Sequence, residues 1–169
     1  QCNELARELD VPYPLAVLLW QRGIRKPNEA REFLKPQLVN LPSPFILKDM
    51  ARAVSLVLTA LRDKWPIYIH GDYEVAGITG SALLARFFRM LGRDVACYQP
   101  DRLTEGYGLQ ESFIKAKAPY QGQSALLITV DCGISDISEV KIAKELGFKV
   151  IVTDHHIPGD ELPPADAIV

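Results

Sequence analysis

Residues 65–80, WPIYIHGDYEVAGITG, contain the change from strand to helix on which the predicted fold depends. The run from Trp65 to Ile69 is apolar and contains β-branched and aromatic residues, which is typical of a buried strand. Gly77 and Gly80 follow, and glycine permits a close backbone approach at the start of the next helix. The stretch therefore predicts a strand that runs through an acidic turn into a helix.

Alternation of strands and helices continues from this stretch to the end of the chain. Each apolar run is followed by a segment with helical periodicity, and Gly92 and Pro119 lie where such helices stop. This alternation predicts an α/β fold, a parallel sheet with helices on both faces. The expected strands are 67–71, 94–100, 124–133, 148–156 and 165–169, and the expected helices are 78–92, 109–119 and 134–147.

The residues before this alternation predict a helical N-terminal segment, 1–64, ahead of a sheet domain at 65–169. Three short helical segments are punctuated by proline and glycine, residues 38–47 contain two prolines and predict a loop, and 48–64 has a helical apolar stripe. Because that stripe needs an apolar partner, we expect residues 3–64 to pack on the sheet. The function of this segment is not evident from the sequence.

Composition narrows the class of protein. The chain has 169 residues, of which 48% are hydrophobic and 24% are charged, as in ordinary globular domains. The formal net charge of −2 excludes a global basic field, so any contact with nucleic acid must come from local basic residues or metal ions. No apolar run approaches the length of a membrane span, and the three cysteines have no metal-ligand spacing. We therefore expect a cytoplasmic protein without disulfides. Because the sequence has no initiator methionine and no signal peptide, we also expect that the chain begins inside a longer gene.

Polar side chains follow three of the expected strands. His70, Asp72 and Glu74 alternate after the first strand, so on an extended segment they share one face. Asp131 follows ALLITV, and the sequence DHH at 154–156 follows FKVIVT, so all three histidines of the chain lie in these clusters. Ligands bind at the carboxyl ends of parallel strands, and mixed nitrogen and oxygen donors suit Mn²⁺, Zn²⁺ or Fe²⁺ better than Mg²⁺. The clusters together predict a binuclear metal site.

Each cluster also has a purely structural explanation. Asp72 and Asp131 are each placed to cap a following helix, and Asp154 is placed to close an Asx turn. The adjacent pair His155–His156 is harder to explain structurally, and the convergence of all three clusters favours a site.

The segment PDRLTEGYGL, 100–109, follows another expected strand, so its loop can join the same edge of the sheet. Arg102 is suited to bidentate phosphate binding, and the ring of Tyr107, between two glycines, is suited to stacking on a base. The alternative is a flexible loop with a solvated arginine.

Four segments occur in an order that resembles the DHH phosphoesterase superfamily, and most closely its RecJ-type single-strand-specific exonucleases: DYEVAGITGSALL, PDRLTEGYGL, LLITVDCGIS and VIVTDHHIPGDELP. The similarity covers about 65–169, with a looser match in the helical segment before it. The resemblance implies a two-metal hydrolase with Mn²⁺ or Mg²⁺, acting 5′→3′ on single-stranded DNA in repair and recombination. It also implies DNA-repair or replication proteins as partners.

The resemblance also assigns roles to individual residues. Asp131 resembles the carboxylate that bridges the two metals, His155 resembles a metal ligand, and His156 resembles the second histidine, near the metal and the scissile phosphate. In the first motif, Asp72 and Glu74 are at positions of metal-binding carboxylates. His70 matches a position that is histidine in some members, and is a further candidate ligand.

The first motif departs from the family pattern. Where the family has DYDxDG, residues 72–77 are DYEVAG, so Glu74 is one methylene longer than the expected aspartate and Ala76 has no ligand atom. We also expect the family's later acidic ligand and its DHHA1 domain to lie beyond Val169. Two explanations remain open for the altered motif, an engineered inactive fragment and a natural member that has lost its chemistry.

Two other functions are compatible with the resemblance. One is another phosphodiesterase of the superfamily, acting on short RNA, a cyclic dinucleotide or pyrophosphate. The other is a non-catalytic RecJ-like assembly module, which Ala76 favours. We expect this chain on its own to have little or no nuclease activity and to bind divalent metal weakly or at one site.

Overall fold

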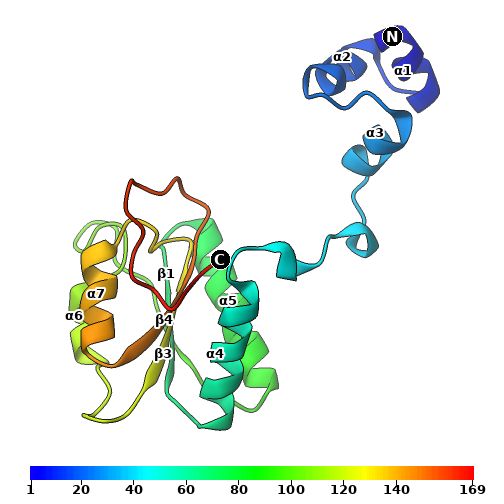
Figure 1. Cartoon of the computed structure of the whole chain (residues 1–169). Coiled ribbons are helices and arrows are strands. Elements are labelled where there is room, and N and C mark those ends of the chain that lie inside the picture. Colours follow the sequence, from blue (N-terminus) through cyan, green and yellow to red (C-terminus); the bar gives the residue numbers. More distant parts are fainter. The chain divides into compact units, whose positions relative to one another are not determined.

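A five-stranded parallel sheet lies at the centre of residues 44–169 in the computed structural model, which describes all residues from 1 to 169 (Figure 1). The strand order is β2-β1-β3-β4-β5, and every neighbouring pair is parallel. This confirms the predicted α/β fold with a parallel sheet. The strands are β1 (Ile67–Gly71), β2 (Ala96–Tyr98), β3 (Ala125–Val130), β4 (Phe148–Thr153) and β5 (Ala167–Ile168).

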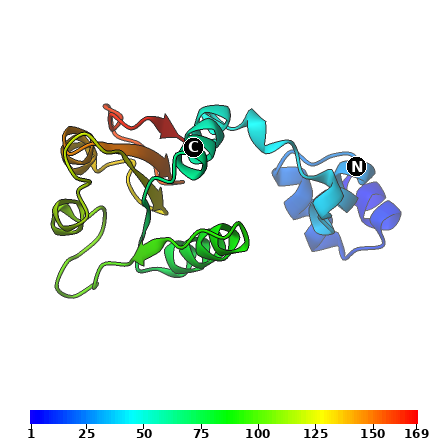
Figure 2. The same cartoon turned by 90° about the horizontal axis from the view of Figure 1, so that it is seen from below.

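Helices cover both faces of this sheet, as the alternation predicts. Figures 1 and 2 show α6 and α7 on one side of the strands and α4 and α5 on the other. Strand β3 lies in the middle of the sheet, and all six of its residues are buried because both faces are covered. The helices are α4 (Met50–Arg62), α5 (Val75–Met90), α6 (Glu111–Ala116) and α7 (Ile137–Glu145).

Two apolar cores follow from the alternation of side chains along each strand. Ile67 and Ile69 of β1 pack with Ala53 of α4 and Phe88 of α5 in one core. The neighbouring Tyr68 packs on the opposite core, which is formed with residues of α6 and α7. His70 is two positions after Tyr68 and therefore faces this second core as well, where its ring lies 5.4 Å from that of Phe113.

The N-terminal residues form a separate compact unit, Gln1–Ser43. Its helices are α1 (Cys2–Leu9), α2 (Tyr13–Gln21) and α3 (Pro27–Leu34), and it has an apolar core of its own. The second unit, Pro44–Val169, includes α4, so the structural boundary lies before the predicted boundary at 64/65. Within the second unit, α4 packs on the sheet through Ala53 and Ala60. Residues 1–43 bury apolar side chains among themselves.

The connection between α3 and α4 contains two short 3₁₀ turns, η1 (Leu38–Asn40) and η2 (Pro44–Ile46), within the segment that was predicted as a loop. The three cysteines are free in the structure. No helix in the structure has both the length and the apolar character that crossing a membrane requires.

The turn between β1 and α5 depends on close backbone contact at Gly77. A Cβ atom on Gly77 would lie 2.3 Å from the backbone oxygen of Asp72 and 2.5 Å from its backbone nitrogen. Backbone atoms cannot move away as a flexible side chain can, so the first turn of α5 can approach the end of β1 only with glycine at this position.

We expect the substitution Gly77→Ala to lower the free energy of unfolding by about 2 kcal/mol or more, because overpacking costs about 1–3 kcal/mol and exceeds the gain in helix propensity. Urea unfolding followed by circular dichroism measures this. The control is Gly159→Ala, since a Cβ on Gly159 meets nothing within 4 Å. Equal stability of the two variants would contradict the tight turn.

Candidate metal centre

The ends of β1, β3 and β4 bring three aspartates side by side. Gly71 pairs with Val130, and Val130 pairs with Thr153, so Asp72, Asp131 and Asp154 each lie one residue beyond a matched position. The ladder continues into these residues, because the amide of Asp72 donates to Val130 at 3.0 Å and the amide of Asp131 donates to Thr153 at 2.9 Å. The order of the strands reverses between β1 and β3, and ligands bind at such a point in open α/β sheets.

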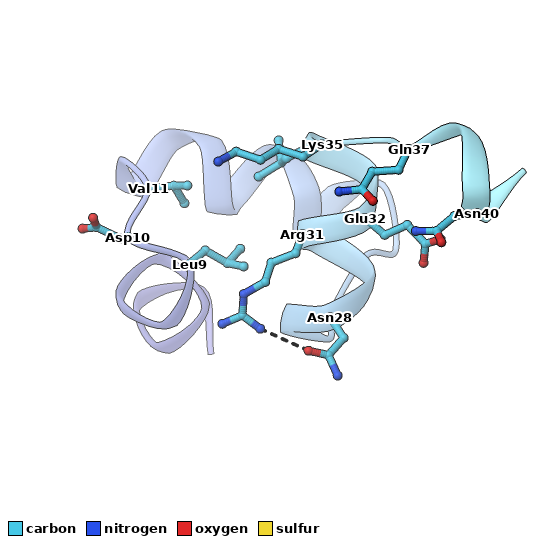
Figure 3. A pocket seen from close by; sticks show the side chains of 10 residues that line it. Leu9, Asp10, Val11, Asn28, Arg31, Glu32, Lys35, Gln37 and Asn40 are labelled. Carbon is cyan, nitrogen blue, oxygen red and sulfur yellow. Dashed lines mark hydrogen bonds between the residues drawn. The ribbon is translucent and has the colours of Figure 1, made fainter.

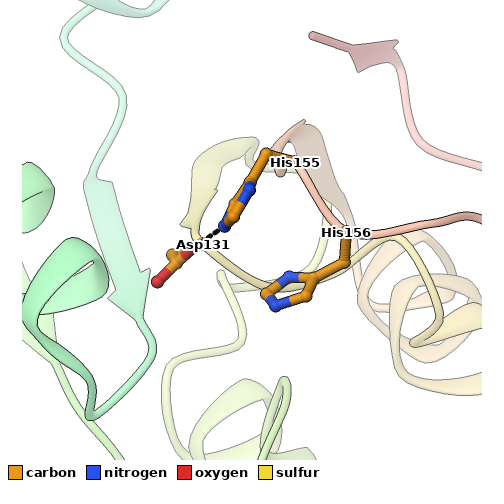
Figure 4. Close-up of side chains that lie close together, drawn as sticks. All are labelled: Asp131, His155 and His156. Carbon is orange, nitrogen blue, oxygen red and sulfur yellow. Dashed lines mark ion pairs between the residues drawn. The ribbon is translucent and has the colours of Figure 1, made fainter. Parts of the chain in front are cut away.

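Asp131, His155 and His156 form the group that can hold a metal ion (Figure 4). One ligand atom from each lies within 4.8 Å of the others, and His155 Nε2 is 3.0 Å from Asp131 Oδ1. The Asp131 side chain is only 8% exposed, whereas the His155 side chain is 78% exposed. A buried carboxylate beneath two accessible imidazoles is a mixed oxygen and nitrogen donor set, which suits a transition metal such as Mn²⁺.

The backbone of Asp131 has an unusual conformation that ends β3 sharply. Its φ angle is 63°, in the left-handed region, which aspartate tolerates better than most residues. Two threonine hydroxyls fix the chain around it. Thr129 Oγ1 donates to the carbonyl of Cys132 at 2.8 Å, and Thr153 Oγ1 donates to the carbonyl of Thr129 at 2.6 Å. Backbone strain held in place by its surroundings is common at functional sites.

Asp154 organises the histidine pair, although the sequence indicated no individual role for it beyond closing a turn. One of its oxygens accepts the amides of His155 and His156 at 2.8 and 3.1 Å, and the other accepts the amide of Ile134 at 3.0 Å. The first oxygen also lies 2.7 Å from Nδ1 of His156. Asp154 thus closes the turn that the sequence suggested for it, and in addition orients an imidazole of the candidate site.

These contacts shift the pKa values of both partners. The hydrogen bond with Asp154 raises the pKa of His156, and the charges of Asp131 and Asp72 add to the effect. Burial alone would raise the pKa of Asp154, but the hydrogen bonds from Ile134 and His156 outweigh it and the net pKa is lowered. Asp154 therefore stays ionised beside the histidine that it orients.

Asp72 contributes a buried carboxylate near this group. The residue is 1% exposed, and its Oδ2 accepts the amide of Glu74 at 3.2 Å. Its Oδ1 is buried and has no hydrogen-bond partner. An unpaired buried carboxylate oxygen is costly unless a cation compensates it, so Asp72 fits a metal site.

Glu74 and Ala76 lie at the start of α5, which begins at Val75. Glu74 is the residue that precedes the helix, and its side chain and that of Ala76 are exposed. Neither lies in the group formed by Asp131 and the two histidines. The alternation that placed Glu74 on one face with His70 and Asp72 ends with β1 at Gly71.

The structure places His70 outside the metal-binding group. It is fully buried, and its Nε2 accepts the amide of Gln110 at 3.2 Å. Burial lowers its pKa to about 4, so the imidazole is neutral. His70 therefore contacts the loop that follows β2, and its Nε2 accepts a hydrogen bond from a backbone amide of that loop.

Tyr107 contacts residues of the candidate centre, and Arg102 lies five residues earlier in the same loop. The Tyr107 hydroxyl donates to the backbone oxygen of Asp131 at 3.0 Å and lies 3.1 Å from His156 Nδ1. The Arg102 guanidinium carbon lies 5.3 Å from the ring centre of Tyr73, a cation–π contact next to Asp72 in the chain. The same loop thus carries Tyr107, which contacts the candidate centre, and the exposed cation of Arg102.

A hollow of about 720 Å³ lies in the N-terminal unit (Figure 3). Arg31 lines it, but its guanidinium already donates to Asn28 Oδ1 at 3.1 Å and to the backbone oxygen of Glu8 at 3.0 Å. The group of three metal-binding side chains in this structure lies at the sheet, not in this hollow.

Comparison with known families and proteins identifies what this chain is similar to. The family model described as "DHH family, N-terminal domain" matches residues 66–169. The single-stranded-DNA-specific exonuclease RecJ of Bacillus subtilis is 39% identical over 167 residues, which is 99% of this chain and 21% of that protein. RecJ of Thermus thermophilus is 40% identical over 164 residues, 97% of this chain and 23% of that protein.

Solved structures give the same result. A structure of exonuclease RecJ bound to manganese has a TM-score of 0.66 and 41% identity, covering 76% of this chain and 31% of that one. The structure of Thermus thermophilus RecJ in complex with Mn²⁺ has a TM-score of 0.70 and 36% identity, covering 99% of this chain and 23% of that one. The chain spans about a fifth of the length of the curated relatives described above.

Proposed function

The chain belongs to the DHH family, and we propose that it is the N-terminal part of a RecJ-like, metal-dependent exonuclease that acts on single-stranded DNA. The observation that carries this proposal is the group formed by Asp131, His155 and His156 at the ends of neighbouring strands. The matched RecJ structures contain Mn²⁺ or Mg²⁺, and the donor set here favours Mn²⁺.

The residues have complementary roles in this proposal. Asp131 and His155 would hold the metal, Asp72 would supply a further carboxylate from the residue after β1, and His156 would bind the metal or the scissile phosphate. Bound divalent ions would lower the pKa of a water molecule and offset charge on the phosphate. Asp154 holds the His156 imidazole by its Nδ1, which leaves Nε2 as the ring nitrogen available to a ligand.

The loop at 100–109 supplies contacts to the nucleic acid. Arg102 is exposed and offers a planar, bidentate donor to a DNA phosphate. Its position over Tyr73 limits its freedom without using its hydrogen-bond donors. Because the net charge of the chain is −2, such local cations and the metal must provide the attraction for DNA. The 5′→3′ direction and the role in repair and recombination rest on the resemblance to RecJ.

A non-catalytic module is a second candidate, and Ala76 is the observation that favours it. The side chain at this position has no ligand atom, and it lies exposed at the start of α5. In this case the parent protein would retain the fold and serve as an assembly subunit with replication or repair proteins.

An assay of the full-length protein distinguishes these functions. We would follow Mn²⁺-dependent cleavage of 5′-labelled single-stranded DNA beside a short RNA, a cyclic dinucleotide and pyrophosphate. The proposal expects degradation of single-stranded DNA, which His155→Ala abolishes. Preference for one of the small substrates would indicate another DHH phosphodiesterase. Absence of hydrolysis, with co-purification of a replication or repair protein, would indicate the module.

A further inference from the structure

Two side chains from different elements hold the loop that carries Tyr107. The amide of Leu109 donates to Asp136 Oδ2 at 2.8 Å, and the next amide, that of Gln110, donates to Nε2 of His70 at 3.2 Å. His70 lies near the end of β1, and Asp136 is the residue that directly precedes α7. Consecutive backbone amides are thus attached to two fixed points of the sheet domain.

Gly108 allows this attachment. Its φ angle is +94°, and a Cβ at this position would lie 2.7 Å from Asp136 Oδ1. Asp136 directly precedes α7, yet it makes no side-chain capping bond to that helix. Its carboxylate is instead used to hold the loop. Burial raises the pKa of Asp136, which agrees with a carboxylate largely withdrawn from water.

The hydroxyl of Tyr107 joins residues from two strands. It donates to the backbone oxygen of Asp131 after β3, and its oxygen lies 3.1 Å from Nδ1 of His156 after β4. The two rings meet edge to face, with centroids 5.7 Å apart and an interplanar angle of 80°. One hydroxyl therefore bridges two residues of the metal-binding group without itself belonging to that group.

We propose that Tyr107 is a positioning residue, held by Asp136 through loop 106–110, whose hydroxyl fixes the spacing between Asp131 and His156. This inference rests on the proposed metal site, but it concerns an arrangement that exists before any metal binds. It gives Tyr107 a role different from stacking on a base, because a base needs only the ring, whereas the bridge needs the hydroxyl.

The first test is Tyr107→Phe in the 169-residue chain, with Tyr120→Phe as the control, because Tyr120 is 84% exposed. Removing an outer-shell partner typically costs about 10–100-fold in metal affinity, so we expect Tyr107→Phe to weaken Mn²⁺ binding about 10-fold. The urea midpoint should fall only slightly, since one hydrogen bond is lost but the ring and its packing remain. Free Mn²⁺ is measured by electron paramagnetic resonance. Affinity equal to that of the control would overturn the inference.

A double-mutant cycle tests whether Asp136 acts through Tyr107. Asp136→Ala should weaken Mn²⁺ binding as much as Tyr107→Phe does, and should add nothing in the Tyr107→Phe background. Asp136→Asn keeps an oxygen acceptor for Leu109 and should retain most of the affinity. Additive losses would overturn the coupling, because a merely destabilising Asp136 variant would act in either background. Should Asp136→Ala not fold, Asp136→Glu, which misplaces the carboxylate, replaces it in the cycle.

A metal-free measurement separates this inference from the proposed function. In histidine-labelled chain, the imidazole resonances of His156 should shift in Tyr107→Phe and stay unchanged in Tyr120→Phe. A wild-type chain that binds no Mn²⁺ would contradict the proposed function, and the histidine spectra would then decide the positioning role alone. Unchanged His156 resonances in Tyr107→Phe would overturn it.

Discussion

Replacing Asp131 by asparagine should lower the Mn²⁺ affinity of the chain by at least about 100-fold. Loss of an outer-shell partner costs up to about 100-fold in metal affinity, and loss of a direct ligand should cost at least as much. Asp131 is the buried member of the metal-binding group and the only carboxylate in it. Asparagine tolerates the left-handed backbone that Asp131 adopts, so the substitution removes the charge and leaves the turn intact. Electron paramagnetic resonance of free Mn²⁺ measures the affinity.

The matched control for Asp131→Asn is Asp160→Asn, which removes the same charge from an exposed residue outside the group. Asp131 lies between the carboxylates of Asp72 and Asp154 at successive strand ends. Removing its charge relieves repulsion, so the urea midpoint of Asp131→Asn should not fall. Loss of binding with retained stability would identify a ligand. Affinity within about twofold of the control would show that Asp131 does not hold the ion.

Restoring the first motif should have the second large effect. The double substitution Glu74→Asp with Ala76→Asp, made in the full-length protein, should raise Mn²⁺-dependent cleavage of 5′-labelled single-stranded DNA by at least about 10-fold. Two-metal catalysis needs two ions about 3.5–4 Å apart, and a missing carboxylate leaves one of them weakly held. Both positions are exposed at the start of α5, where the helix dipole favours acidic residues, so the fold should tolerate the change.

A single added carboxylate elsewhere on the same helix controls for charge. Thr79→Asp places an acid one turn further along the exposed side of α5 and should not increase cleavage. If the unrestored protein cuts as fast as the restored one, Ala76 does not occupy a ligand position and the alignment of the first motif is wrong. Cleavage by neither version, with a retained partner protein, would favour the assembly module.

The sheet was predictable because its strands are continuous apolar runs followed by periodic helices. The run at 125–130 is buried throughout and the run at 148–153 is buried except at Lys149 and Thr153, and such strands have a clear sequence signal. The adjacency of β1, β3 and β4 then brings Asp131 close to His155 and His156, as their positions after apolar strands suggested.

The faces on which side chains lie, and the boundary between the two units, depend on the residue at which each strand or helix ends, and the sequence did not define those residues. Alternation placed His70, Asp72 and Glu74 on one face, but β1 ends at Gly71 and the chain turns into α5. The pattern along β1 instead directs His70 into the core beside Phe113. The amphipathic stripe of α4 did not indicate whether this helix groups with the residues before it or with the sheet, and in the structure it belongs to the unit Pro44–Val169.

The bonds that orient the site also connect residues far apart in the chain. The contact between Asp136 and Leu109 joins positions 27 residues apart, and that between His70 and Gln110 joins positions 40 apart. Propensity and periodicity describe local structure, so no pattern in the sequence indicates such pairs. The segment at 100–109 was predicted to be a loop, but the sequence did not indicate the partners that hold it.

The central claim is that the ends of β1, β3 and β4 bind a divalent metal ion. Anomalous diffraction at the manganese absorption edge, from crystals of the chain grown with Mn²⁺, tests it most directly. We expect a peak coordinated by the Asp131 carboxylate and at least one imidazole of His155 and His156. Manganese bound elsewhere on the chain with no peak at this group, or no bound manganese at saturating Mn²⁺, would contradict the claim.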